Sequence, residues 1–175
     1  MKDETMENQQ ERLLESELGW LAGIIDGEGS LTINVNSTHR SVYPRVWISS
    51  SEKEILDKAA AILAKFGQKF SHKWKQPKGN RRPHGYIVII TASRVRKILT
   101  KLLPYLSSKT NRAECLIEFC ESRMKLPYGY PYTERELELQ KNISKMQLKG
   151  GKKTSSGIPN DYTPSLRPRY RLKKI

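Results

Sequence analysis

The stretch Leu18–Thr32 reads LGWLAGIIDGEGSLT, and the other elements of the chain are arranged around it. Gly19, Gly23 and Gly27 recur in it at every fourth position. Residues four apart lie on the same face of a helix, so the glycines predict a groove without side chains where another helix can approach closely. Because a glycine inside a helix costs about 1 kcal/mol relative to alanine, three in register indicate a close-packed pair of helices.

Two acidic residues, Asp26 and Glu28, stand at the end of this otherwise apolar helix. We expect the helix to begin near Arg12 or Ser16 and to run to about Asp26. A carboxylate at a helix C-terminus meets the negative end of the helix dipole, which is unfavourable for stability. The same position is well suited to holding a cation.

Immediately after these two acidic residues, the spacing of apolar residues changes from a helical period to every second position. Leu31, Ile33 and Val35 alternate with the polar residues Ser30, Thr32, Asn34 and Asn36. Alternation of this kind predicts a strand with one apolar and one polar face. A second alternating strand near 42–50 follows a turn at 37–41, so the pair predicts an antiparallel hairpin.

Helical periodicity and turn residues predict the remaining elements. Capping boxes at Ser51–Glu54 and Thr133–Glu136 mark two helix starts. The expected elements are a helix from 51 ending at Gly67, a strand near 69–75, a turn over 76–83, a strand over 86–91, a helix capped by Ser93 and stopped before Pro104, a helix from Ser107 or Ser108 with Ala113, Leu116, Ile117, Cys120 and Met124 on its inner face, and a last helix to about Leu148.

This order predicts an α+β fold with an αββαββα core. Two hairpins between helices give a four-stranded antiparallel sheet with helices on one face and polar residues on the other. Extra C-terminal helices and a basic tail complete the chain. We divide it into a flexible N-terminus (1–11), a core (12–126), a helical extension (127–150) and a basic extended tail (151–175).

The charge of the chain favours a polyanionic partner. Its 175 residues contain 32 Lys and Arg against 18 acids, a net charge of +14. Such an excess is typical of proteins that bind nucleic acid or an anionic membrane, and the absence of a strongly amphipathic basic helix argues against the membrane. A polar, basic sheet face can lie in the major groove of DNA. Two alternative interpretations are that the sheet face is simply solvated and that the protein is a basic ribosome-associated protein.

The sequence carries no targeting or membrane signal. No run approaches the roughly 18 apolar residues of a membrane span. The first 17 residues hold six acids against Lys2 and Arg12, unlike a signal or transit peptide. We expect an intracellular protein that stays where it is made, in a bacterial, archaeal or phage-infected cytoplasm or an organelle. Cys115 and Cys120 share one predicted helix, which indicates a reducing interior without disulfides or a zinc cluster.

The segment Leu21–Gly29, LAGIIDGEG, resembles the signature of the LAGLIDADG homing endonucleases. The αββαββα order around it, over about Ser16–Leu126, matches that family's core. One copy of the signature is present, and we find no second. Family members with one copy work as homodimers. The resemblance therefore implies that a helix packs against its twofold mate through Gly19, Ala22, Gly23 and Gly27.

The resemblance also implies an activity and its residues. It implies an intron-encoded, site-specific endonuclease that makes a metal-dependent double-strand break in a long pseudo-palindromic DNA target. Glu28 matches the family's metal-binding acid, with the carbonyl of Gly27 as a further ligand; oxygen donors select Mg²⁺, with Mn²⁺ as a substitute. Lys109 matches a basic residue near the cleaved phosphate, and Ser50 stands where the family often orders water. We expect a structural role for Asp26.

Strand parity places the first four expected DNA contacts, Ser30, Thr32, Asn34 and Asn36, on the face shared with Glu28. Further contacts are expected from Arg40, Arg45, Trp47, Lys73, Lys75, Arg81 and Arg82. Parity over 69–75 is ambiguous, because Phe70, His72 and Trp74 could face outward instead. Two alternatives without cleavage stay open on the same fold: an intron RNA maturase, with intron RNA as the less favoured partner, and a DNA-binding regulator.

Overall fold

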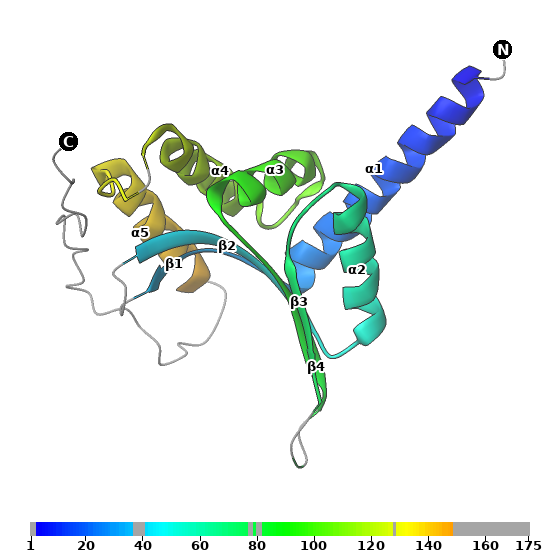
Figure 1. Cartoon of the computed structure of the whole chain (residues 1–175), viewed down its shortest axis with the longest axis horizontal. Helices are drawn as coiled ribbons and strands as arrows, with labels where there is room; N and C mark the ends of the chain where they lie inside the picture. The colour runs from blue at the N-terminus through cyan, green and yellow to red at the C-terminus, as the bar shows by residue number, and fades with distance from the viewer. Residues whose placement is uncertain (1–2, 37–40, 77–78, 80–81, 128, 149–175) are drawn as a thin grey trace, which may run out of the picture.

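The computed structural model describes residues 3–36, 41–76, 79, 82–127 and 129–148. The elements, in chain order, are α1 (Asp3–Glu28), β1 (Gly29–Asn36), β2 (Ser41–Ser50), α2 (Lys53–Lys65), β3 (Ser71–Lys75), β4 (His84–Ile90), α3 (Ala92–Leu102), the 3-10 turn η1 (Leu103–Tyr105), α4 (Thr110–Lys125) and α5 (Glu134–Leu148) (Figure 1). This order confirms the predicted αββαββα core with additional C-terminal helices. The predicted basic tail lies outside the described residues.

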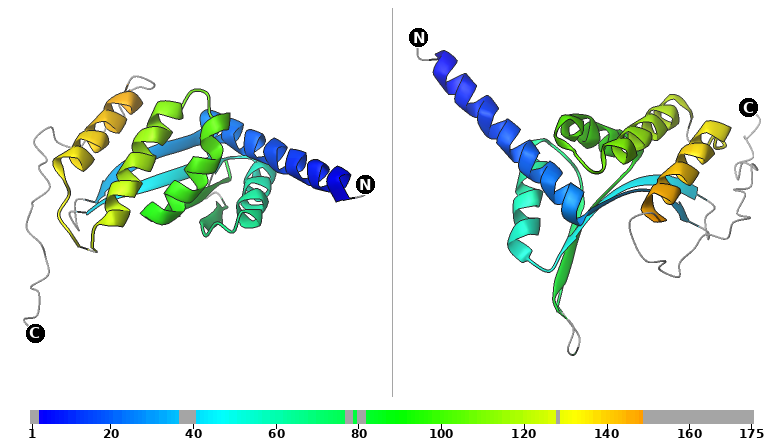
Figure 2. Two further views of the ribbon diagram at one scale, coloured as in Figure 1. Left: turned by 90° about the horizontal axis from the view of Figure 1, so that it is seen from above. Right: turned by 180° about the vertical axis from the view of Figure 1, so that it is seen from behind.

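The four strands form one antiparallel sheet in the order β1-β2-β4-β3, so that β2 and β4 are central. Figures 1 and 2 show α2, α3 and α4 on one side of the curved sheet, with α5 at its β1 end. No described helix covers the other side at the central strands, and we call that side the open face. Within the described part of the chain, no helix is long and apolar enough to cross a membrane.

The core lies between the sheet and the helices, because alternate strand residues point to it. Leu31, Val46, Ile48, Ile87 and Ile89 are each at most 1% exposed. The helices complete this core with Leu21, Ile25, Leu56, Leu63, Leu99, Leu116 and Phe119, among others. The alternation in the sequence therefore predicted the buried side of the sheet correctly.

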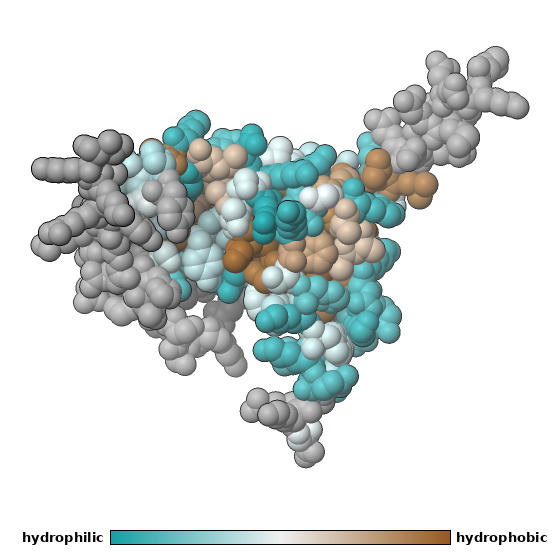
Figure 3. All heavy atoms as spheres, in the orientation of Figure 1, coloured by the Kyte–Doolittle hydropathy of each residue, from teal (hydrophilic) through white to brown (hydrophobic). Residues whose placement is uncertain are grey.

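Helix α1 begins at Asp3, earlier than the expected start at Arg12 or Ser16. Residues 3–11 are polar but contain no glycine or proline and several good helix formers, so helix propensity continues α1 where apolar periodicity is absent. The N-terminal half of α1 projects from the body (Figure 1). Figure 3 shows a hydrophobic patch where it leaves the body, and Leu13 and Leu14 are 65% and 38% exposed.

The two predicted capping boxes have different outcomes. The box at Thr133 is confirmed: Glu136 N donates to Thr133 Oγ1 (3.2 Å), and Thr133 N donates to Glu136 Oε2 (2.9 Å). The box at Ser51 is wrong, because α2 has Glu52 as its N-cap without a side-chain capping bond. Glu52 N donates instead to Ser50 Oγ (3.0 Å).

Two further helix details differ from expectation. Met124 was expected on the inner face of its helix but is 50% exposed, and Phe119 is fully buried there instead. Helix α3 begins at Ala92 after Thr91, whose φ of 93° is unusual for a residue with a side chain, so Ser93 lies inside the helix rather than at its cap.

The C-terminal extension covers an otherwise unpaired edge of the sheet. Strand β4 pairs with β2 only as far as Arg45, so it does not reach Val42. Tyr132, just before α5, takes its place: its hydroxyl donates to Val42 O (2.9 Å) and accepts from Val42 N (2.7 Å). Pro44, which lies between Val42 and Arg45 in β2, has no N–H that would need a partner at this edge. The extension thus holds the β1–β2 hairpin in place.

Candidate functional site

The site is built where the C-terminus of α1 meets the N-terminus of α4. The Asp26 carboxylate accepts hydrogen bonds from Ser107 N (2.7 Å), Ser108 Oγ (3.0 Å) and Lys109 N (3.0 Å). Burial by itself raises the pKa of Asp26, but these hydrogen bonds outweigh it and hold the pKa below its ordinary value. Asp26 therefore caps α4 from another helix, and α4 has no capping side chain at its own N-cap.

Lys109 makes the reciprocal contact. Its Nζ donates to the carbonyl oxygens of Ile25 (2.7 Å) and Asp26 (2.6 Å), which lie in the last turn of α1. A cation at a helix C-terminus satisfies orphan carbonyls and complements the helix dipole. Burial is the main cause that lowers the pKa of Lys109, the charge of Asp26 opposes it, and weaker effects come from Arg112 and Glu28. The acid of α1 and the base of α4 thus lock the two helix ends together.

Glu28 is the last residue of α1, and its side chain is exposed. The chain turns directly into β1 at Gly29, where an added Cβ would lie 2.6 Å from the Ile25 carbonyl oxygen. Only glycine therefore permits this abrupt change from helix to strand. Among the described residues no ion pair within 4.0 Å involves Glu28.

The donors around Glu28 fit a hard cation only in part. The Lys109 ammonium donates hydrogen bonds to two carbonyl oxygens of the last turn of α1. The next carbonyl along the helix is that of Gly27, which lies beside Glu28 in the sequence. In the described part of the chain no group of three or more His, Cys, Asp or Glu could hold a metal ion. One carboxylate and one carbonyl are too few for the octahedral oxygen shell of Mg²⁺. A metal site here needs oxygens from outside the protomer.

The glycine stripe of α1 is open at two of its three positions. A Cβ added at Gly23 or Gly27 would meet no atom of the described residues within 4 Å, whereas at Gly19 it would lie 4.0 Å from the Tyr105 ring. Ala22, which was expected in a dimer interface, is fully buried within the protomer. It lies one residue before Gly23, about 100° around the helix, and therefore points to the core. The open groove consists of Gly23 and Gly27.

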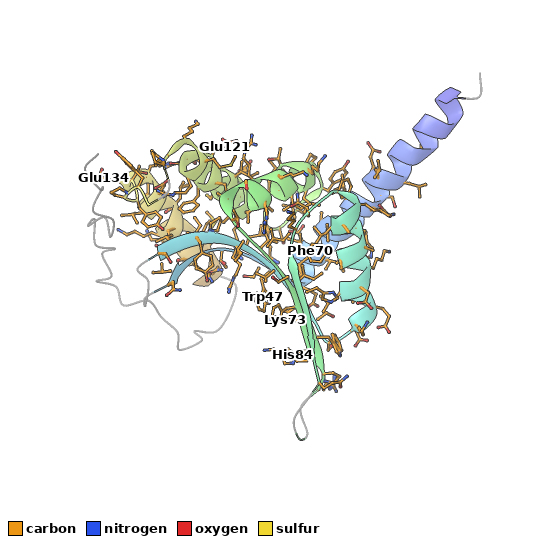
Figure 4. The ribbon with its side chains drawn as sticks, in the orientation of Figure 1. Trp47, Phe70, Lys73, His84, Glu121 and Glu134 are labelled. Atoms are coloured by element: carbon orange, nitrogen blue, oxygen red, sulfur yellow. The ribbon has the colours of Figure 1, made fainter. Side chains whose placement is uncertain are left out.

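The open face of the sheet carries aligned rows of side chains. Ser30, Trp47, Val88 and Ser71 form one row across the four strands. Thr32, Arg45 and Ile90 form the next. Figure 4 shows Trp47, Lys73 and His84 on the side of the ribbon away from Glu121 and Glu134, which lie among the C-terminal helices.

Aromatic rings and cations alternate on this face. The rings of Trp47 and Tyr86 are stacked, with centroids 4.2 Å apart and planes 19° from parallel. The Arg45 guanidinium lies 5.2 Å from the Trp47 ring, and the Lys75 ammonium lies 5.6 Å from the Tyr86 ring. Burial is the main cause of the shift in the pKa of Arg45, and it lowers that pKa below its ordinary value.

The structure places several expected DNA contacts on the open face. Ser30, Asn34 and Asn36 are half-buried there, and Thr32 is 5% exposed. With the Asn34 amide oriented to satisfy both partners, it donates to Thr32 Oγ1 (2.8 Å) and accepts from Arg45 Nη1 (2.9 Å). Thr32 is therefore covered by its neighbours in the isolated chain.

Lys73 and Lys75 also belong to the open face, where they lie opposite Tyr86 and His84. Phe70 and Trp74 pack against the core instead, which resolves the parity of this strand. Arg82 is described and exposed. The remaining expected contacts, Arg40 and Arg81, lie outside the described residues.

Ser50 does not share a sheet face with Ser30 and Asn34. It lies opposite Gly85, on the side where an added Cβ at Gly85 would clash with Trp74 and Leu56. Ser49, opposite Tyr86, has the parity of the open face. Sequence reasoning missed several residues of that face, although the alternation of 84–90 and of the end of β2 carried the signal for some of them, namely Ser49, Tyr86, Val88 and Ile90.

The sequence comparison identifies the family. A family profile described as a LAGLIDADG-like domain matches residues 15–102, half of the chain. The chain therefore belongs to the LAGLIDADG family. No curated protein matches the sequence.

The fold is similar to those of several solved homing endonucleases. I-CvuI, in complex with an I-CreI target, is 17% identical with a TM-score of 0.59, over 81% of this chain and 87% of that chain. The archaeal intron-encoded I-Vdi141I, complexed with DNA, is 16% identical with a TM-score of 0.60, over 80% and 89% of the two chains. The meganuclease I-SmaMI, bound to uncleaveable DNA, is 15% identical with a TM-score of 0.53, over 77% of this chain and 45% of that chain. At these identities the likeness establishes the fold.

Proposed function

We propose that this protein is a homodimeric, site-specific DNA endonuclease, encoded in a mobile intron, that makes a metal-dependent double-strand break in a long pseudo-palindromic target. One observation carries the proposal. The reciprocal Asp26–Lys109 cap holds the exposed Glu28 at the end of an open glycine groove and at the start of an open, basic sheet face.

Dimerisation is supported by the groove of Gly23 and Gly27, at which an added Cβ would meet no described residue within 4 Å. A second α1 can approach there backbone to backbone. The match of 77% of this chain to only 45% of the I-SmaMI chain also supports it, because two copies of the matched part would account for nearly the whole of that protein. Glu28 is adjacent to Gly27, so close packing would bring two Glu28 carboxylates near the twofold axis.

DNA binding is supported by the charge and the shape of the open face. The net charge of +14 favours association with phosphates, and Arg45, Lys73 and Lys75 bring cations to this face. A sheet surface with polar side chains fits the major groove, where base edges can be distinguished. Ser30, Asn34 and Asn36 supply hydrogen-bonding groups for such contacts.

For the chemistry, the Glu28 carboxylate and the Gly27 carbonyl would hold Mg²⁺, or Mn²⁺ in its place, together with oxygens of the second copy and of the DNA. When bound, a divalent cation activates water and stabilises the leaving oxygen. Lys109 would stabilise phosphate charge from a fixed position, because the two carbonyls hold its ammonium in place. We assign the water-ordering role expected of Ser50 to Ser49, which has the parity of the open face.

The test compares Glu28→Gln with the wild-type chain on a target selected from a random duplex library. We expect Glu28→Gln to bind the target like wild type and to cut on the order of a hundredfold or more slowly in Mg²⁺, the usual effect of losing one electrostatic stabiliser at a reacting centre. The matched control is Glu134→Gln, an exposed acid in the first turn of α5. We expect this control to cut like wild type.

One outcome would overturn the nuclease assignment, and another would overturn the assignment of Glu28 to the metal site. If wild type binds duplex DNA but never cuts it in Mg²⁺ or Mn²⁺, the protein is a non-cleaving regulator. If Glu28→Gln cuts as fast as Glu134→Gln, the metal site lies elsewhere.

A further inference from the structure

An apolar patch lies in the middle of the open face. It consists of Trp47 on β2 and of Tyr86, Val88 and Ile90 on β4, the two central strands of the sheet. Val88 lies directly opposite Trp47, and the Trp47 ring stacks on Tyr86. Ile90 follows Val88 on the same face of β4, so the four side chains occupy neighbouring positions of that face, which we call the apolar patch.

The apolar patch is not part of the core. The intervening residues Ile87 and Ile89 are 1% exposed and belong to the core, but Ile90 is 45% exposed. Trp47 and Val88 are half-buried by their neighbours on a face that no described helix covers. A contiguous apolar surface left in water indicates a contact with a partner.

The surroundings of the apolar patch favour a polyanion as this partner. Arg45 lies beside Ile90 in the sheet and approaches the Trp47 ring at 5.2 Å. Lys73 lies opposite Tyr86, and Lys75 approaches the Tyr86 ring at 5.6 Å. Apolar side chains within a border of cations fit duplex DNA better than an apolar protein partner, because the cations can meet phosphates on both sides of a groove.

Within a DNA duplex, the apolar patch can meet only one kind of apolar group. The base faces are stacked on each other and are out of reach. Among the groups that the bases display in the major groove, the C5-methyl of thymine is the apolar one, and the others are hydrogen-bond donors and acceptors. Val88 and Ile90 have no polar side-chain atom, so they would leave those donors and acceptors without partners.

We propose that the apolar patch reads thymine methyl groups in the major groove, so that Trp47, Val88 and Ile90 determine part of the target sequence. This inference rests on the proposed function. Residues two apart on a strand are separated by about 7 Å, close to two base-pair steps of about 3.4 Å. The methyl-dependent positions are therefore expected within about three consecutive base pairs of each half-site.

The experiment removes the methyl groups from the DNA and leaves the protein intact. The full chain first selects a target from a random duplex library, with Ca²⁺ in place of Mg²⁺. Each thymine of the selected target is then replaced by deoxyuridine, which lacks only the methyl group. We expect affinity to fall about fourfold for a methyl read in one half-site, and on the order of fifteenfold when both half-sites are changed, as for burial of one methyl-sized group at each.

A variant then links the effect to the apolar patch. In Val88→Ala/Ile90→Ala, the ratio of affinities for the thymine and deoxyuridine targets should approach one at the positions that these two residues read. Met124→Ala removes an equally exposed apolar side chain from α4, behind the sheet, and should keep the wild-type ratio.

The possible results distinguish a failure of thymine readout from a failure of the proposed function. If the chain binds its selected target but tolerates deoxyuridine at every position within twofold, thymine readout is refuted and the proposed function stands. Thymine readout by the apolar patch is also refuted, and the proposed function also stands, if the Val88→Ala/Ile90→Ala variant keeps the full methyl dependence. If no duplex sequence is selected above non-specific binding, the proposed function is overturned and this inference with it.

Discussion

Replacing Gly23 by leucine should break the dimer without harming the fold of the protomer. An added Cβ at Gly23 meets no described residue within 4 Å, and the position is exposed, so we expect the isolated protomer to accommodate the leucine. Leucine is a better helix former than glycine by nearly 1 kcal/mol. The change should therefore raise the melting temperature of the monomer by about 2–4 °C, the shift expected for 1 kcal/mol in a domain of this size.

The same leucine should be costly between two copies of α1. Inserting a large side chain into a close-packed contact costs about 1–3 kcal/mol, and twofold symmetry counts that cost twice. A total of about 2–6 kcal/mol would raise the dissociation constant of the dimer at least about thirtyfold. Cleavage should be lost although Glu28 and Lys109 are still present.

Two measurements separate assembly from stability. Sedimentation velocity over a range of concentrations gives the dissociation constant, and thermal unfolding at the lowest concentration gives the stability of the monomer. Thr100→Leu is the matched control, because it adds the same side chain at an exposed position of α3. If Gly23→Leu dimerises within threefold of wild type, the glycine groove is not the interface and the reasoning is refuted.

Three further outcomes are expected. Asp26→Asn should lower the free energy of unfolding by about 1–2 kcal/mol at pH 7 in urea titrations. Because hydrogen bonds hold the pKa of folded Asp26 below its ordinary value, its stabilisation is complete above that value and disappears as the pH falls through the folded pKa, so the variant should match wild type in strong acid. Tyr132→Phe should cost about 1–3 kcal/mol, because a buried edge loses its partner, with faster amide exchange at Val42 as the specific sign. Lys73→Met should reduce the slope of log K against log salt by about 1 for each protomer if Lys73 meets a phosphate, and an unchanged slope would exclude that contact.

The local elements of this protein could be predicted because their signals are local. The alternation of Leu31 and Ile33 with polar residues defined a strand and its two faces, and the order of periods predicted the core fold. The position of Glu28 at a helix end followed from the same periodicity. Errors arose where local cues conflict: Ser51 resembles a cap, yet the chain starts α2 one residue later, and polar residues 3–11 are helical without an apolar stripe.

The candidate site depended on both levels. Glu28 and the glycine stripe could be found from the sequence, since their spacing and chemistry lie within one helix. Ala22 could not be separated from the stripe without knowing where the core lies, whereas the alternation within β2 already separated Ser49 from Ser50. The apolar patch was missed because its members come together only when the two central strands pair.

The partnership of Asp26 and Lys109 was decided by the tertiary structure alone. The sequence placed an acid near one helix end and a lysine near another helix start, but the two residues are 83 positions apart. Their contact depends on how α1 and α4 approach each other over the sheet. Hydrogen bonds of this kind require positions correct to within an ångström, which only the packing of the whole core provides. The local sequence thus determines which chemical groups stand at the end of α1, and the packing of the whole fold determines their geometry.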